Sequence, residues 1–256
     1  MKVVRRLPLL LLALLLAAPP VRPHAGSASD PGGAAVCPAP RLPPATVPRL
    51  RAALAKGEPA VIVAVGSSST QGWMASDAAH TYPAVLQALL AEALPHDHVA
   101  VLNRGISGQD AAQEVARMDV DVVAVRPQLV IWQVGANGVL KNVDPALFRH
   151  LVTAGVQRLH GAGIDVILMD NQRSPRILAA TEHVIIDQAL AQVAAETGAS
   201  LFARGALMEA WRAQGEPYSA FISADGLHHN DHGYRCVAAA LAGSIVAGLG
   251  PESPHG

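Results

Sequence analysis

The sequence AVIVAV at residues 60–65, followed at once by GSSSTQG at residues 66–72, decides the fold. Consecutive apolar residues, most of them β-branched and without polar alternation, predict a strand that is covered on both faces. The glycines and hydroxyl-bearing residues that follow are typical of a tight turn out of that strand. Strands covered on both faces occur mainly in parallel sheets, so we expect helices on either side of this one.

The rest of the chain alternates between short apolar runs and amphipathic stretches, as a parallel sheet requires. Four further runs predict strands, at residues 99–103, 128–134, 164–169 and 200–203. Stretches with helical character predict helices at residues 82–94, 111–125, 145–160, 178–197 and 231–249. The predicted fold class is α/β, a three-layer α/β/α sandwich with a central parallel sheet of about five strands. Ligands of such sheets bind beyond the carboxyl ends of the strands, so we expect a site in the loops there.

Length and charge limit the kinds of protein that this chain can be. With 256 residues, 51% of them hydrophobic, it is long enough for one large domain and a sizeable core. A formal net charge of -1 argues against a nucleic-acid partner and against binding to a membrane surface through basic residues.

The amino-terminal residues predict an export signal. Lys2, Arg5 and Arg6 precede an almost pure Leu/Ala run at residues 7–18, which is shorter than the roughly 20 residues that span a bilayer. The expected organisation is a signal peptide at residues 1–28, a Pro/Ala-rich leader at 29–57 and one domain at 58–250. This organisation predicts a secreted or periplasmic protein with no membrane span after cleavage, and an uncleaved anchor is the alternative.

The two cysteines fit an oxidising compartment. Cys37 lies in the leader and Cys236 in the last predicted helix, so a disulfide would join the two ends of the mature chain. Two free thiols are the alternative, because sequence alone does not show that the two residues are close.

Polar and glycine-rich segments follow three of the predicted strands, and a histidine-rich segment precedes the last helix. They lie at residues 66–72, 103–108, 135–138 and 225–234. Taken singly, the first can be a Ser-rich loop or an anion-binding nest, the second a turn, and the third a helix cap or an oxyanion donor. Only the carboxyl-terminal segment suggests chemistry by itself.

In that segment Asp225 and His228 stand three residues apart, so one short loop can bring both to the same place. A carboxylate in this position can fix the tautomer of an imidazole and stabilise the imidazolium that forms when it takes a proton. Metal binding by His228, His229 and His232 together with Asp225 is the alternative, although no His-Glu-x-x-His motif or cysteine set accompanies it.

Together the four segments resemble, in order and content, the characteristic blocks of the SGNH (GDSL-like) hydrolase superfamily, of the esterase and lipase type. The resemblance covers residues 58–248 and implies the flavodoxin-like SGNH hydrolase fold. It selects Ser68 as nucleophile through the spacing of Gly66 and Gly72, and Asp225 and His228 as its catalytic partners. It also implies an oxyanion hole made by the backbone N–H groups of Ser68 and Gly108 and the side-chain amide of Asn137.

The function that this resemblance implies is an exported serine esterase that uses a Ser-His-Asp triad and an acyl-enzyme. Its expected substrates are small acyl esters or carbohydrate O-acyl esters, and neither a cofactor nor a metal is expected. An O-acyltransferase with the same residues, or a catalytically silent envelope or carbohydrate-binding protein on the same fold, are the alternatives.

Two positions depart from the family pattern. Ser67 stands where an Asp commonly precedes the nucleophile, and Gly138 stands where an Asp often follows the third-block Asn. Neither change removes a proton-transfer group or an oxyanion donor, so both bear on rate and substrate preference more than on reaction class.

A few large or charged side chains near these blocks are further candidates for substrate contact. Trp73 and Trp132 can stack on a sugar or line an acyl pocket, or simply pack in the core or its rim. Arg173 and Arg176 follow the fourth predicted strand and can either face the cleft or remain solvated loop charges.

Overall fold

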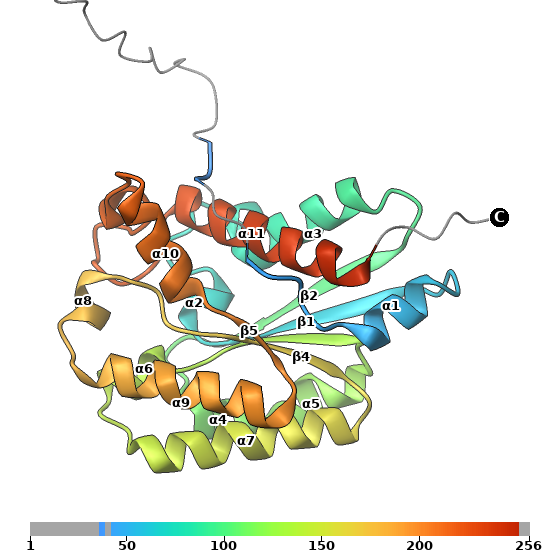
Figure 1. Ribbon diagram of the computed structural model, residues 1–256, viewed down its shortest axis with the longest axis horizontal. Helices are drawn as coiled ribbons and strands as arrows, with labels where there is room; N and C mark the ends of the chain where they lie inside the picture. Colours follow the sequence, from blue (N-terminus) through green and yellow to red (C-terminus); the bar gives the residue numbers. More distant parts are fainter. Residues whose placement is uncertain (1–35, 39–41, 251–256) are drawn as a thin grey trace, which may run out of the picture. The chain divides into compact units, whose positions relative to one another are not determined.

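A computed structural model describes residues 36–38 and 42–250, and the signal peptide predicted at residues 1–28 lies outside them. The described chain holds a five-stranded sheet in the order β2-β1-β3-β4-β5, with every neighbouring pair parallel (Figure 1). The strands are β1 Ala60–Gly66, β2 Val99–Gly105, β3 Leu129–Gln133, β4 Asp165–Met169 and β5 Ser200–Phe202. This is the flavodoxin-like order, in which the chain reverses its direction of growth between β1 and β3.

Helices cover both faces of the sheet, which confirms the predicted α/β/α sandwich (Figure 1). One face carries α1 Pro48–Leu54, α3 Tyr82–Ala93, α10 Arg204–Ala213 and α11 Asp231–Leu249. The other carries α4 Ala111–Ala116, α5 Met118–Asp121, α6 Ala136–Leu140, α7 Pro145–Gly161, α8 Pro175–Leu178 and α9 Glu182–Thr197. The four-residue helix α2, Ser68–Gln71, and the 3-10 turns Ala78–His80, Val123–Val125 and Tyr218–Ala220 complete the elements.

The strands contribute side chains to two separate hydrophobic cores, because successive side chains of a strand point to opposite faces of the sheet. In β3, Leu129 and Ile131 pack with α3 and α11, whereas Val130 and Trp132 pack with α7 and α9. All of these side chains are buried, which explains why the strands read as continuous apolar runs.

The helix predicted over residues 111–125 is broken in the structure, and the reason is a long-range contact. α4 ends at Ala116, and Arg117 adopts φ -105 and ψ 0 at the junction with α5. Its guanidinium reaches the Gly66 carbonyl through Nη2 at 3.1 Å and the Gln109 side-chain oxygen through Nε at 2.6 Å. Local periodicity contains no signal of such contacts.

The predicted leader also contributes to the fold. α1 lies within it, and Leu50, Ala53 and Leu54 on that helix are buried. Asp165, at the start of β4, accepts hydrogen bonds from the N–H groups of Arg49 and Leu50 at 2.7 and 3.2 Å and thereby caps this short helix. This part of the leader therefore packs with the domain expected at residues 58–250.

A disulfide joins Cys37 to Cys236 on α11, as predicted, with the two Cα atoms 5.2 Å apart. It therefore ties the start of the described chain to the last helix. Within residues 36–38 and 42–250, none of the helices has the length and apolar character needed to cross a membrane.

Candidate active site

Ser68 is the first residue of α2, and one residue, Ser67, separates it from the carboxyl end of β1. A Cβ on Gly66 would lie 2.5 Å from Thr70 Oγ1 and 2.7 Å from the Gln133 carbonyl oxygen, closer than side chains approach. Gly72, at the other end of the helix, has φ +100, which favours glycine. The two glycines therefore allow the tight turn that holds Ser68 at the sheet edge.

The structure brings the three predicted catalytic residues into one line. Ser68 Oγ lies 2.8 Å from His228 Nε2, and His228 Nδ1 lies 2.5 Å from Asp225 Oδ2. Because a carboxylate only accepts, Nδ1 carries the proton toward Asp225, which leaves Nε2 as an acceptor for the serine O–H. This is the arrangement in which an imidazole can take the serine proton.

Asp225 is held as a carboxylate by four donors. Its Oδ1 accepts from the Ser223 hydroxyl at 2.7 Å and from the backbone N–H groups of Leu227 and His228 at 2.9 and 3.0 Å, and its Oδ2 accepts from the His228 ring. Partial burial alone raises the pKa of Asp225, but these hydrogen bonds outweigh it and hold that pKa well below its ordinary value. Asp225 is therefore ionised throughout the neutral range.

The three predicted oxyanion donors lie in the segments that directly follow β1, β2 and β3. Among the described residues, nothing accepts a hydrogen bond from the backbone N–H of Ser68 or of Gly108. Asn137, near the start of α6, donates one N–H of its side-chain amide to the Gln109 carbonyl at 2.7 Å. That bond leaves the second N–H of the amide and aligns the loop after β3 with the loop after β2.

Two basic residues that sequence reasoning missed brace the same loops. Lys141 Nζ donates to the Gly108 carbonyl and to Asp110 Oδ2, both at 2.9 Å. Arg117, through its contacts with Gly66 and Gln109, links the end of β1 to the loop after β2. Both act on carbonyl groups of distant segments, so no local motif could have shown them.

The departures from the family pattern are accommodated without a carboxylate. Ser67 is buried, and its hydroxyl and N–H lie 3.2 and 3.3 Å from Gln133 Oε1. The same oxygen accepts from Thr70 Oγ1 at 3.3 Å. A Cβ at Gly138 would make only ordinary contacts with Phe148 and Val143. At Ser67, a neutral hydrogen-bond network thus occupies the place of the expected acidic residue.

The two tryptophans near the site have different roles. Trp132 is fully buried, and its indole N–H donates to Glu114 Oε2 at 2.8 Å, so it belongs to the core. Trp73 is 53% exposed, and its ring centroid lies 6.4 Å from that of His228. Its carbonyl accepts from the Tyr234 hydroxyl at 2.7 Å, which fixes the backbone of Trp73 beside His228.

The alternative of a histidine metal site does not match the geometry. His228 faces Ser68, His229 is buried with Nδ1 3.1 Å from the Phe221 carbonyl, and His232 lies against the Cys37–Cys236 disulfide. Burial, followed by the charge of Arg204, lowers the pKa of His229 to about 3, so this imidazole is neutral.

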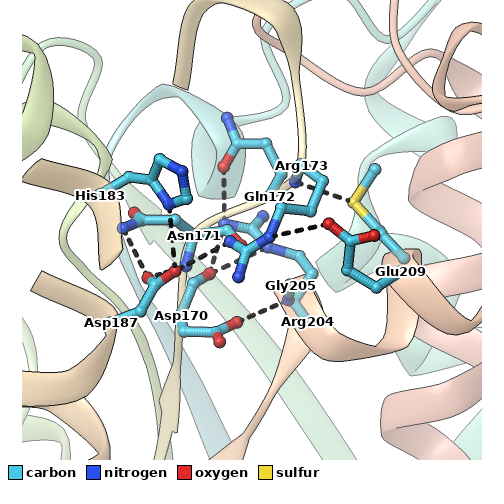
Figure 2. A network of polar contacts seen from close by, with 10 residues as sticks. Asp170, Asn171, Gln172, Arg173, His183, Asp187, Arg204, Gly205 and Glu209 are labelled. Carbon is cyan, nitrogen blue, oxygen red and sulfur yellow. Dashed lines mark hydrogen bonds and ion pairs between the residues drawn. The ribbon is translucent and has the colours of Figure 1, made fainter. Parts of the chain in front are cut away.

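Arg173 is not a solvated charge either. Its Nη1 donates to Asp187 Oδ2 at 2.8 Å, and its Nε lies 3.6 Å from Glu209 Oε1 (Figure 2). The side chain of Arg173 is therefore neutralised within the fold. Arg176 is exposed, and its backbone N–H donates to the Gly226 carbonyl at 3.0 Å.

Comparison with known proteins agrees with the predicted resemblance. In sequence, the chain is 29% identical over 115 residues to the esterase TesA of Pseudomonas aeruginosa. The match covers 45% of this chain and 52% of TesA, so it spans about half the length of that relative.

Several solved structures share the fold. A two-domain esterase active on acetylated mannans has a TM-score of 0.70 at 19% identity, covering 84% of this chain and 56% of that one. An α/β hydrolase enzyme from the metagenome of Lake Arreo has a TM-score of 0.63 at 20% identity, covering 75% and 97%. A catalytic mutant of the acetylxylan esterase Axe2 from Geobacillus stearothermophilus has a TM-score of 0.60 at 20% identity, covering 75% and 95%.

A family model for the Non-GDSL lipase-like family matches residues 35–251, which is most of the chain. That match includes all five strands and every candidate catalytic residue. The word "non-GDSL" fits the Ser67 found beside Ser68, because the Asp of the usual block is missing there. The chain has the SGNH hydrolase fold and belongs to the Non-GDSL lipase-like family.

Proposed function

We propose that this protein is an exported serine esterase that hydrolyses carboxylic esters through an acyl-enzyme. The observation that carries the proposal is the hydrogen-bonded line from Ser68 through His228 to Asp225, at 2.8 and 2.5 Å. The predicted signal peptide and the Cys37–Cys236 disulfide support the export part of the proposal.

In the first half of the reaction, Ser68 Oγ attacks the ester carbonyl while His228 Nε2 takes its proton. Asp225 holds the ring and stabilises the imidazolium that results. His228 then gives the proton to the leaving alcohol, which departs and leaves the acyl group on Ser68. In the second half, the same histidine activates water, which attacks the acyl-enzyme and releases the acid.

Negative charge develops on the carbonyl oxygen in both halves. The N–H groups of Ser68 and Gly108 and the free N–H of Asn137 are the donors that we assign to it. Since Lys141 and Arg117 brace these loops, the donors are oriented before the substrate binds. Preorganised donors of this kind stabilise the transition state without reorganisation during the reaction.

The substrates that we propose are esters of carbohydrates or other small acyl esters. His228 must protonate the leaving oxygen, so the alcohol part of the ester lies on the histidine side of the site. The exposed indole of Trp73 stands on that side and offers a flat apolar face to the alcohol. A sugar ring fits such a face, and two structural neighbours are esterases of acetylated polysaccharides.

The test is labelling of the purified protein with a fluorophosphonate, together with an ester panel. The panel contains acetyl, butyryl and octanoyl aryl esters and acetylated xylan. Wild type should label and release acid, and Ser68→Ala should do neither. Ser76→Ala is the matched control, because it removes an exposed hydroxyl that contacts His80 instead of His228, and it should label normally.

Each failure has a distinct meaning. Labelling that persists in Ser68→Ala excludes Ser68 as the nucleophile. If wild type is not labelled but binds glycans, the proposed esterase activity is wrong and the protein is a binding protein. Acylated acceptor that forms faster than free acid shows a transferase.

A further inference from the structure

The segment that follows β4 is polar and yet buried. Asp170, Asn171, Gln172 and Ser174 are all buried, at the same sheet edge as the catalytic loop. Figure 2 shows this segment surrounded by Asp187, Arg204 and Glu209 from α9 and α10. The mechanism above uses none of these side chains. Buried polar groups are costly unless they are paired, so the pairing indicates what the segment does.

Arg204 is the centre of the pairing and is only 1% exposed. Its Nε and Nη2 donate to the Asp170 carbonyl at 3.0 and 2.7 Å, and Nη2 also donates to Gln172 Oε1 at 2.8 Å. The Asp170 carboxylate instead accepts from the Gly205 N–H at 2.9 Å. The buried guanidinium of Arg204 thus directs its hydrogen bonds to neutral oxygens of the segment after β4.

Gln172 connects Arg204 to the catalytic loop. It is 1% exposed, and its Nε2 donates to the Leu227 carbonyl at 3.0 Å. Leu227 immediately precedes His228 in the chain, and its own N–H donates to Asp225. The next carbonyl back, that of Gly226, accepts from the Arg176 N–H at 3.0 Å. The segment after β4 therefore holds two successive carbonyl groups next to His228.

The direction of the Gln172 amide is set by chemistry. Arginine has only donors and a backbone carbonyl has only acceptors. With Arg204 on one side and Leu227 on the other, Oε1 must face the guanidinium and Nε2 must face the carbonyl. A flipped amide would place donor against donor and acceptor against acceptor, and would leave four buried polar groups unpaired.

We propose that Gln172, oriented by the buried Arg204, is a positioning residue that holds the backbone next to His228 and thereby the His228 ring against Ser68. This proposal rests on the proposed function. Gln172 contacts no reacting atom, so it acts through the Leu227 carbonyl. Its removal lets the loop shift by a fraction of an ångström, and displacements approaching 1 Å can cost about 100-fold in rate.

The decisive variant is Gln172→Glu, which keeps the shape and the acceptor for Arg204 but removes the donor to Leu227. We expect kcat on an aryl ester to fall by about 10- to 100-fold, with KM changed less than about threefold because the side chain is buried away from substrate. The rate of fluorophosphonate labelling should fall with kcat. The downfield proton resonance of the His228–Asp225 hydrogen bond should broaden or shift.

Gln87→Glu is the matched control. Gln87 makes the same kind of bridge elsewhere, with Nε2 donating to the Val99 carbonyl at 2.8 Å and Oε1 accepting from the Val101 N–H at 2.6 Å. It joins α3 to β2 and touches none of the catalytic residues. This variant should lose stability while kcat and the downfield resonance stay within about twofold of wild type.

The results separate the inference from the proposed function. If wild type does not label, the proposed function fails. If wild type labels and Gln172→Glu keeps its kcat and resonance, or if both variants lose kcat in proportion to stability, the positioning role is overturned. If Gln172→Glu does not fold, Gln172→Met takes its place, because it removes the same donor without adding charge. A kcat in Gln172→Met equal to that of wild type would also overturn the positioning role.

Discussion

Burial of Glu114 makes the stability of this protein sensitive to pH in a way that can be calculated. Glu114 on α4 is 1% exposed, and among the described residues the only hydrogen bond to its carboxyl group comes from the indole of Trp132. Burial is the largest influence and raises the pKa of Glu114 from 4.5 to about 8, while Trp132 and then Arg117 act against it. The native protein therefore keeps a proton that the unfolded chain has already released at neutral pH.

The sign follows from proton linkage. Between pH 4.5 and 8 the native state binds one proton more than the unfolded state at this residue, so a rise in pH favours unfolding. The free energy of unfolding falls by about 1.4 kcal/mol per pH unit on this account. A glutamine amide cannot ionise but still accepts from Trp132, so the substitution Glu114→Gln should remove this fall. From pH 5 to pH 8 the difference between the two proteins should grow by about 3.5 kcal/mol in favour of the variant.

The measurement is urea unfolding followed by tryptophan fluorescence at pH 5, 6, 7 and 8, with the disulfide intact. Asp170, whose pKa burial raises to about 7, and His229 titrate in both proteins and cancel in the difference. Glu196→Gln is the control, because that carboxylate is exposed and paired with Arg149 on the surface. If the free energies of wild type and Glu114→Gln change in parallel with pH, Glu114 is not protonated in the fold and the reasoning fails.

Three further predictions concern the disulfide, the oxyanion donors and the packing of the sheet. Replacing Cys37 and Cys236 together by Ser should lower the free energy of unfolding, by at most about 5 kcal/mol if the disulfide acts through the entropy of loop closure. The folded fraction should retain its kcat. An unchanged midpoint of urea unfolding would contradict the expected loss of stability. Asn137→Ala should lower kcat on an aryl ester by about 100- to 1,000-fold with little change in KM, and a change within twofold removes it from the oxyanion hole. Gly155→Ala should lower the melting temperature, because its Cβ would lie 2.6 Å from the ring of the buried Trp132; an unaltered melting temperature would show that the ring can move aside.

Sequence reasoning succeeded where the signal is local. The strands were predicted within two residues of their observed ends, because apolar β-branched runs bounded by glycine leave little choice of structure. It failed for α10, Arg204–Ala213, whose second residue is glycine and whose start is fixed by the Asp170 carboxylate from the end of β4. A helix that begins through a contact with a segment far away in the chain gives no capping signal of its own.

In the candidate site too, sequence reasoning found the residues that have a local signal and missed those that act through distant contacts. The proximity of Ser68, Asp225 and His228 could be expected because their residue types and spacing match a family pattern, and their catalytic role stays a prediction. The residues that contact the backbone around the site were missed, and these are Gln172, Arg204, Lys141 and Arg117. Each of them acts by pairing with a backbone carbonyl or amide that is brought near only by folding. Predicting such residues requires the topology first.

The last strand ends at Phe202, whereas His228 lies beyond it and 160 positions after Ser68. All five strands can therefore be synthesised and paired before His228 has been made. A chain that is still incomplete at that point carries Ser68 without the histidine that contacts it in the fold, so the proposed triad is not yet assembled. The hydrogen-bonded line from Ser68 to Asp225 therefore depends on a segment that is made only after the whole sheet.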